Sequence, residues 1–120
     1  MRIIITGSRE WPQVYLPELR RRIADRLFDL PVTSTIVHGN ARGVDRTAHQ
    51  EAEKLGLLVE PHPADWERNG KAAGHIRNAH MALLGADLCI AFWDGSSNGT
   101  AGMIECAKAK GIEVEEVRLP

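Results

Sequence analysis

The sequence predicts an α/β domain of three layers, with a five-stranded, mainly parallel sheet between two layers of helices. Short apolar runs typical of buried strands alternate with segments whose apolar residues recur every three or four positions, as on one face of a helix. A length of 120 residues suits a single domain, residues 1–120, with one core. Right-handed crossovers with two helices on each face make 3-2-1-4-5 the most economical strand order.

The first half of the chain predicts two strands and two helices. Residues 2–6 form a β-branched run that ends at a turn sequence, and residues 35–39 form a second apolar run. Between them we expect a helix from near Pro17 to just before Pro31, with an apolar face made of Leu16, Leu19, Ile23, Leu27 and Leu30. The second helix is expected to bury Val44, Ala48, Ala52 and Leu55. Gly56 should end it in a left-handed conformation.

The second half continues the alternation. Residues 57–61 predict a third strand, followed by a turn-rich segment over 63–70. A third helix should end at Gly85 and bury a stripe made of Ile76, Ala79 or His80, and Leu83. Residues 87–93 are the most apolar run and predict a central strand. A fourth helix is expected from about Gly99 to Lys110, and residues 112–117 alternate as an edge strand.

Composition excludes several classes of protein. No apolar run approaches the roughly 20 residues needed to cross a membrane, and the N-terminus has no secretory pattern. The net charge of −1 argues against general nucleic-acid binding. Cys89 and Cys106 have neither metal-ligand spacing nor the density of a disulfide framework, which favours buried thiols and a cytoplasmic location. No two histidines lie four residues apart on one helix, so we expect no metal site, and no cofactor is indicated.

Three glycine-containing loops follow the first, second and fourth predicted strands. They are 7–11 (GSREW), 39–45 (GNARGVD) and 94–100 (DGSSNGT). In a sheet of this order a ligand binds beyond the C-terminal strand ends, at the switch point between strands 1 and 4. The last loop also precedes a helix, whose N-terminus favours an anion, although any strand-to-helix turn needs similar residues. The predicted phosphate-binding residues in these loops are Gly7, Ser8, Arg9, Gly39, Arg42, Gly43, Gly95, Ser96, Ser97, Asn98, Gly99 and Thr100.

Several common sites are absent from the sequence. It contains no Gly-x-x-x-x-Gly-Lys-Ser/Thr loop and no complete dinucleotide fingerprint, which argues against ATP hydrolysis and hydride transfer. It also lacks the Gly-x-Ser-x-Gly elbow of serine hydrolases.

Four segments carry a family resemblance: IITGSREW, VHGNARGVDRTA, PADWERNGKAAGHIRNAHM and GADLCIAFWDGSSNGTAGMI. In this order they resemble the motifs of the SLOG superfamily, most closely its YspA-like branch. The resemblance implies a Rossmann-like domain that binds nucleotides or nucleotide-derived ligands. The superfamily includes the Lonely Guy phosphoribohydrolases and the DNA-binding recombination mediator DprA. Because its members are often dimers, a homodimer or higher homo-oligomer is expected.

The chain departs from the Lonely Guy motifs at the residues that cleave N-glycosidic bonds. Arg77 matches the family's arginine and is a candidate catalytic and phosphate-binding residue. Asn78 replaces the adjacent lysine and is a candidate phosphate contact. Met103 stands where the motif has its glutamate. A methionine cannot act as a base or stabilise a positively charged sugar. Glu105 is two positions further on, which turns its side chain by about 200° to the opposite helix face.

Other residues could supply the missing chemistry. Asp65 is the best alternative catalytic or ribose-binding carboxylate, and Trp66 beside it offers a flat surface for a base. The alternative is that Asp65 caps the next turn and Trp66 packs the loop against the sheet. Asp45 is most simply a charge at a helix N-terminus, and it is also a candidate ribose contact. Trp11 either covers the site or packs beside the first strand. Three functions remain open: a nucleotide-binding sensor, an enzyme acting on an N-glycosidic or phosphoester bond, and a single-strand DNA binder, which the balanced charge disfavours.

Overall fold

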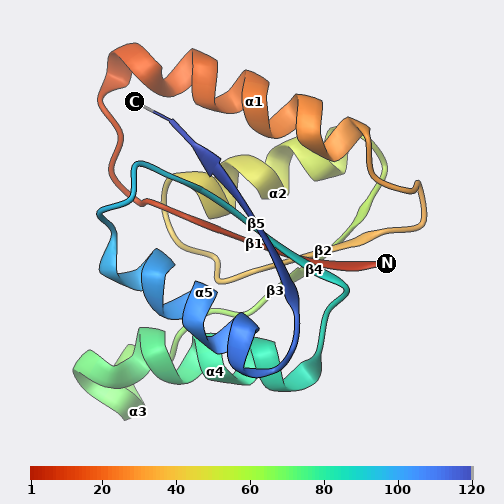
Figure 1. Cartoon of the computed structure of the whole chain (residues 1–120). Coiled ribbons are helices and arrows are strands. Elements are labelled where there is room, and N and C mark those ends of the chain that lie inside the picture. The colour runs from red at the N-terminus through yellow and green to blue at the C-terminus, as the bar shows by residue number, and fades with distance from the viewer. Residues whose placement is uncertain (120) are drawn as a thin grey trace.

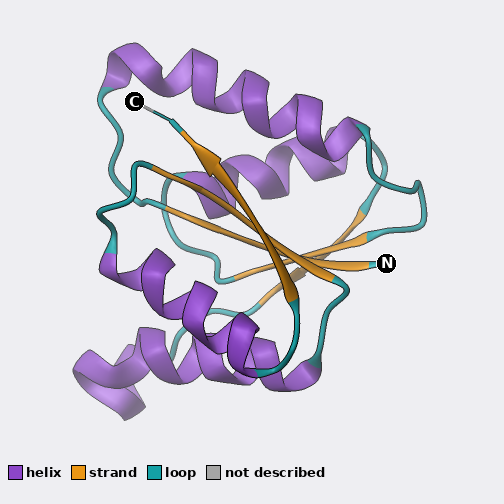
Figure 2. Cartoon of the chain, in the orientation of Figure 1, coloured by secondary structure: helices purple, strands orange, loops and turns teal. Residues whose placement is uncertain are grey.

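The computed structural model describes residues 1–119 and contains one sheet of five parallel strands (Figures 1 and 2). The strands are β1 (Arg2–Gly7), β2 (Thr35–His38), β3 (Leu58–Pro61), β4 (Leu88–Trp93) and β5 (Glu113–Arg118). Their spatial order is β3-β2-β1-β4-β5, and every neighbouring pair is parallel. The predicted order 3-2-1-4-5 is therefore confirmed.

Helices cover both faces of the sheet. In the view of Figure 1, α1 (Leu16–Phe28) and α2 (Val44–Lys54) lie above the sheet, whereas α4 (Ala73–Leu84) and α5 (Asn98–Ala109) lie below it. Short helices precede α1 and α4, namely η1 (Gln13–Tyr15), α3 (Trp66–Asn69) and η2 (Gly70–Ala72). The three-layer Rossmann-like architecture is thus confirmed, with two long helices on each face.

The core consists of two layers separated by the sheet. Ile3 and Ile5 of β1 pack with α1 and α2 on one face, whereas Ile4 packs with α4 and α5 on the other, as the alternation of a strand requires. All six residues of β4 are buried, and the strand lies inside the sheet between β1 and β5, so the prediction of a buried inner strand is confirmed. β5 is an edge strand, and each of its residues is exposed or half-buried.

The predicted apolar stripe of α4 is wrong. Ile76 and Leu83 are 45% and 67% exposed, while the helix buries Ala73, Asn78, Met81 and Ala82 instead. Both sets have helical spacing, so periodicity alone cannot choose between them. The buried set is dominated by small side chains, which allow α4 to pack against α5 and the sheet.

Smaller differences concern element ends. Leu16 and Leu55 were expected on buried stripes, but each lies at a helix terminus and is about 40% exposed, at 42% and 39% respectively. Gly56 has the predicted left-handed conformation, with φ of +76°.

Cys89 is buried and Cys106 half-buried, and both thiols are free. Across residues 1–119, none of the helices has the length and apolar character to cross a membrane.

Candidate ligand-binding site

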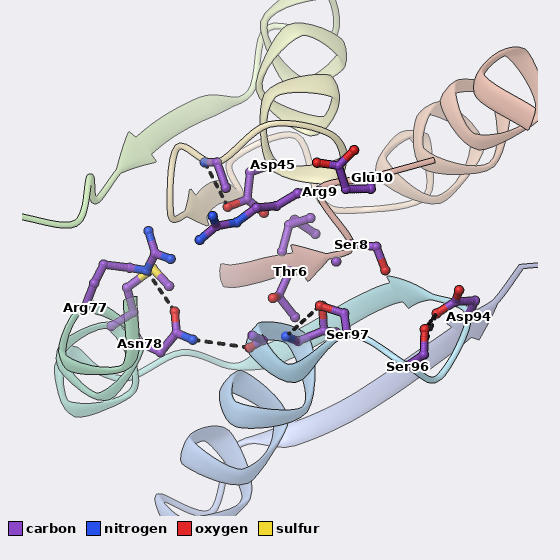
Figure 3. A pocket seen from close by; sticks show the side chains of 16 residues that line it. Thr6, Ser8, Arg9, Glu10, Asp45, Arg77, Asn78, Asp94, Ser96 and Ser97 are labelled. Carbon is purple, nitrogen blue, oxygen red and sulfur yellow. Dashed lines mark hydrogen bonds between the residues drawn. The ribbon is translucent and has the colours of Figure 1, made fainter. Parts of the chain in front are cut away.

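A cavity of about 450 Å³, called the main cavity below, opens at the C-terminal end of β1 (Figure 3). Its walls come from the loops after β1, β2 and β4, from the N-terminal turns of α2 and α5, and from α4. Arg9 and Asp45 lie above the pocket in Figure 3, Ser97 lies below it, and Arg77 and Asn78 lie at one end. The lining residues that sequence analysis named are Gly7, Ser8, Arg9, Asp45, Arg77, Asn78, Ser96, Ser97, Gly99 and Thr100.

The N-terminus of α5 forms one wall of the main cavity. Ser97 is the N-cap residue, and its Oγ accepts hydrogen bonds from the backbone N–H of Thr100 at 3.3 Å and from the Thr100 hydroxyl at 3.0 Å. Within residues 1–119, the backbone N–H groups of Asn98 and Gly99 have no hydrogen-bond partner. These free donors and the helix dipole make this end of α5 attractive to an anion.

Ser8 adds an unused hydrogen-bonding group to the opposite wall. The residue is 7% exposed, and its Oγ has no partner among the described residues. The backbone at Ser8 approaches the start of α2 closely at Gly43. Gly43 has φ of +75°, and a Cβ at this position would lie 2.5 Å from the Ser8 carbonyl oxygen, so only glycine fits. The Val44 N–H donates to the same carbonyl at 3.3 Å.

Two arginines face the main cavity without forming an ion pair to any carboxylate in residues 1–119. Arg77 is half-buried and donates to neutral acceptors, which are the carbonyls of Gly39 and His62 and the Asn78 Oδ1. Burial lowers the pKa of Arg77, and the positive charge of Arg9 lowers it further, whereas the charge of Asp45 opposes the shift. Arg9 makes neither an ion pair nor a side-chain hydrogen bond with the described residues. The cavity therefore contains positive charge without a directly bonded counterion.

Asp45 is the buried carboxylate of the main cavity. It is 6% exposed, and its Oδ2 accepts hydrogen bonds from the backbone N–H groups of Gly39 at 3.0 Å and Ala41 at 3.3 Å. Burial raises the pKa of Asp45 to about 6, although these hydrogen bonds and the charge of Arg77 favour its ionised form. The residue does lie in the first turn of α2, as the sequence indicates, but the loop 39–43 also encloses it.

A second hollow of about 320 Å³ adjoins the main cavity and is called the arginine hollow. It is lined by Arg9, Gly39, Asn40, Ala41, Arg42, Arg46, Pro63, Ala64, Trp66 and Arg77. Sequence analysis missed Arg46, although its position directly after the glycine-containing loop 39–45 could have identified it. Trp66 is 50% exposed, and the Arg9 guanidinium carbon lies 5.7 Å from the centre of its ring.

Some predicted site residues lie outside both hollows. Asp65 caps α3 by accepting a hydrogen bond from the Arg68 N–H at 3.1 Å, and it lines a separate hollow with His62 and His80. Trp11 donates from its ring nitrogen to the Ser8 carbonyl at 2.9 Å and packs against the core beneath α1. The other such residues are Gly43, Gly95 and Asn98, and Arg42 lines the arginine hollow rather than the main cavity.

Met103 and Glu105 lie on different sides of α5. Met103 is fully buried between α5, α4 and the sheet, whereas Glu105 is exposed. Neither side chain lines the main cavity.

His38 is a structural residue beneath the β2 loop. It is fully buried, its Nδ1 accepts from the Asn40 N–H at 3.0 Å, and its Nε2 therefore carries the proton and donates to the His49 Nδ1 at 2.8 Å. Burial lowers the pKa of His38 to about 4. In the described part of the chain, no three histidine, cysteine or acidic side chains gather as they would around a metal ion.

Comparisons with known proteins identify a matching family, a similar phage protein and a similar solved structure. The model of a family described as YspA, cpYpsA-related SLOG matches residues 1–69. The Gene 61 protein of Mycobacterium phage D29 is 41% identical over 118 residues, which cover 94% of this chain and 93% of that protein. The X-ray structure of DNA processing protein A (DprA) from Streptococcus pneumoniae superposes on 99% of this chain with a TM-score of 0.70 and 19% identity. The chain corresponds to 50% of that protein's length, and this likeness concerns the fold.

Proposed function

Since this chain belongs to the YspA, cpYpsA-related SLOG family, we propose that it binds a nucleotide or nucleotide-derived phosphate ligand in the main cavity, as a sensor or processing domain. The observation that carries the proposal is the convergence of unpartnered positive groups on one cavity. The main cavity is lined by two arginines that have no carboxylate partner, Arg9 and Arg77. The N-terminus of α5, with its free N–H groups, forms another part of its wall.

A phosphate would satisfy these groups together. Burying a hydroxyl such as Ser8 Oγ without a hydrogen-bond partner lowers the stability of the fold by roughly 1–3 kcal/mol. Phosphate oxygens are strong acceptors and would supply that partner. Arginine binds phosphate with charge-assisted and often bidentate hydrogen bonds. The cavity volume of about 450 Å³ lies within the range of pockets that hold small molecules.

Thermal unfolding with a panel of ligands tests the proposal. The panel contains nucleoside monophosphates, ribose 5-phosphate, NAD, ADP-ribose and cyclic nucleotides. A ligand at a hundred times its dissociation constant adds about 2.7 kcal/mol to the free energy of unfolding, a rise of several degrees in Tm. The same ligand should stabilise R9A much less, while R22A on α1 controls for the loss of one positive charge. If no member of the panel raises the Tm, the proposal fails.

A second candidate function is hydrolysis of the N-glycosidic bond of a bound nucleotide. Asp45 favours it, because this carboxylate faces the main cavity and its pKa of about 6 suits a group that takes up a proton near neutral pH. Water would attack the C1′ carbon and lose a proton to Asp45 while the bond from C1′ to the base breaks. The departing base would take up a proton from solvent, and Asp45 would return its proton to solvent. Arg77 would stabilise the negative charge of the phosphate or the negative charge that develops on the leaving base.

Product analysis separates binding from hydrolysis. Each stabilising ligand is recovered and analysed by chromatography, so that intact ligand indicates a sensor and free base with sugar phosphate indicates a hydrolase. D45N should abolish turnover and retain binding. D65N is tested in parallel, because Asp65 is the alternative carboxylate, and loss of turnover in D65N alone would assign the reaction to it instead.

We propose further that the chain forms a homodimer or a higher homo-oligomer, as the family resemblance implies. The outward face of α4 supports this proposal, because Ile76, Leu83 and Leu84 leave apolar side chains exposed there. Light scattering during size-exclusion chromatography measures the mass directly. A monomeric mass at every concentration tested would refute the proposal.

A further inference from the structure

We propose that the ligand carries two phosphate groups, one bound at the α5 N-terminus and the other in the arginine hollow. The chemical class is a nucleoside diphosphate or a derivative linked through a diphosphate. The inference rests on the proposed function and specifies which ligands the site selects.

The two hollows adjoin each other. Arg9, Ala41 and Arg77 line both the main cavity and the arginine hollow, so these residues form the border between the two. A ligand that fills both hollows would pass the side chains of Arg9 and Arg77.

The distribution of charge indicates what the second hollow accepts. Four arginines line it and no carboxylate does, whereas Glu10, Asp45 and Asp94 line the main cavity beside its two arginines. Arg46 makes no ion pair with residues 1–119. Arg42 pairs with Glu10 at 2.6 Å, but both side chains are largely exposed, at 68% and 82%, and an exposed pair of this kind is weak. A phosphate can replace it at little cost.

The loop that carries Arg42 is held in place before any ligand arrives. The Asp45 carboxylate accepts hydrogen bonds from both sides of Asn40, through the N–H groups of Gly39 and Ala41. Asn40 itself has φ of +56°, and its N–H is bonded to the buried His38. A fixed loop reduces the entropy lost when its groups bind an anion, which favours a specific site over diffuse attraction.

Titration calorimetry with matched ligands tests the inference. The probes are the four common nucleoside monophosphates and their diphosphates, which differ only in the second phosphate. In the unmodified protein we expect the preferred diphosphate to bind about ten- to a hundredfold more tightly than its monophosphate. This is the gain expected from the hydrogen bonds between arginine and one additional phosphate. R46A should bring this ratio close to one while the monophosphate affinity stays nearly constant. R22A, which removes a half-buried arginine of α1 that lines neither hollow, should leave the ratio unchanged.

The outcomes separate the inference from the proposed function. If monophosphates and diphosphates bind equally, or if R46A leaves the ratio intact, the main cavity binds its ligand but the second phosphate site does not exist. If R46A weakens both classes alike, Arg46 acts on the whole site and the inference fails. If neither class binds, the proposed function fails together with the inference. If an oligothymidylate binds instead, with a steep loss of affinity at rising salt, the arginines serve a nucleic acid and the inference is overturned.

Discussion

Replacing Asp45 by asparagine should change how the stability of the protein depends on pH. The substitution preserves the shape of the side chain and an oxygen that can accept hydrogen bonds from the N–H groups of Gly39 and Ala41. It removes the titratable group. The difference in free energy of unfolding between the variant and the unmodified protein therefore reports the titration of Asp45 alone.

The size and sign of the effect follow from the pKa of Asp45, which is raised from 3.8 to about 6 in the folded chain. Between these values the folded state binds more protons than the unfolded state, so the contribution of Asp45 to stability is lost as the pH rises through this window. A shift of about two units corresponds to about 3 kcal/mol at pH 7. Relative to the unmodified protein, D45N should therefore gain about 2 kcal/mol between pH 4 and pH 7, since part of the titration of the unfolded carboxyl lies below pH 4.

The comparison with D45N is needed because His38 has an opposite effect over nearly the same window. Its pKa falls from 6.5 to about 4, so the unfolded state binds the extra proton and stability rises with pH. The two contributions oppose each other in the unmodified protein, so its stability curve alone does not isolate the titration of Asp45. Only the difference between the two proteins exposes the carboxylate.

Urea unfolding followed by tryptophan fluorescence at several pH values between 4 and 7.5 measures both curves. A difference that does not change with pH would mean that Asp45 titrates at an ordinary pKa. The reasoning that a dry, enclosed environment surrounds this carboxylate would then be wrong.

Three further substitutions test other parts of the structure. G43A should destabilise the fold by about 1–3 kcal/mol, since the left-handed backbone and the nearby Ser8 carbonyl oppose a Cβ; an unchanged urea midpoint would contradict this. M103A should lower stability by about 2–5 kcal/mol, because it empties part of the core between α4 and α5, and ligand affinity measured by calorimetry should stay the same. L83S on the exposed face of α4 should change the stability of a monomer by less than about 0.5 kcal/mol, so that a larger loss which grows with protein concentration would indicate an oligomer built on this face.

The fold could be predicted from the sequence because its strongest signals are local. The wholly apolar run of β4 and the β-branched run of β1 define the centre of the sheet, and alternation with helices leaves few topologies. The stripe of α4 could not be predicted in the same way. Ile76 and Leu83 are more hydrophobic than Ala73 and Ala82, but helix α4 buries the small residues because they allow close packing.

The candidate site was predictable in position but less so in its electrostatics. The rule for strand ends selected the loops that meet at the main cavity. The burial of Asp45 depends on how the loop 39–43 encloses it, and the placement of Asp65 depends on α3, a four-residue helix within a segment that reads as a turn. Both are tertiary outcomes that residue types and spacings do not encode.

The pairing of β1 with β4 also determines when the ligand site can exist. The two strands lie side by side. In the sequence, however, they are separated by β2, β3 and the helices from η1 to α4. As the polypeptide leaves the ribosome, residues 1–69 can form β1, β2 and β3, but the opposite wall of the main cavity is supplied by α4 and the start of α5. The main cavity is therefore completed late in synthesis, and a chain cut before residue 100 would have the arginine loops without the helix end that faces them.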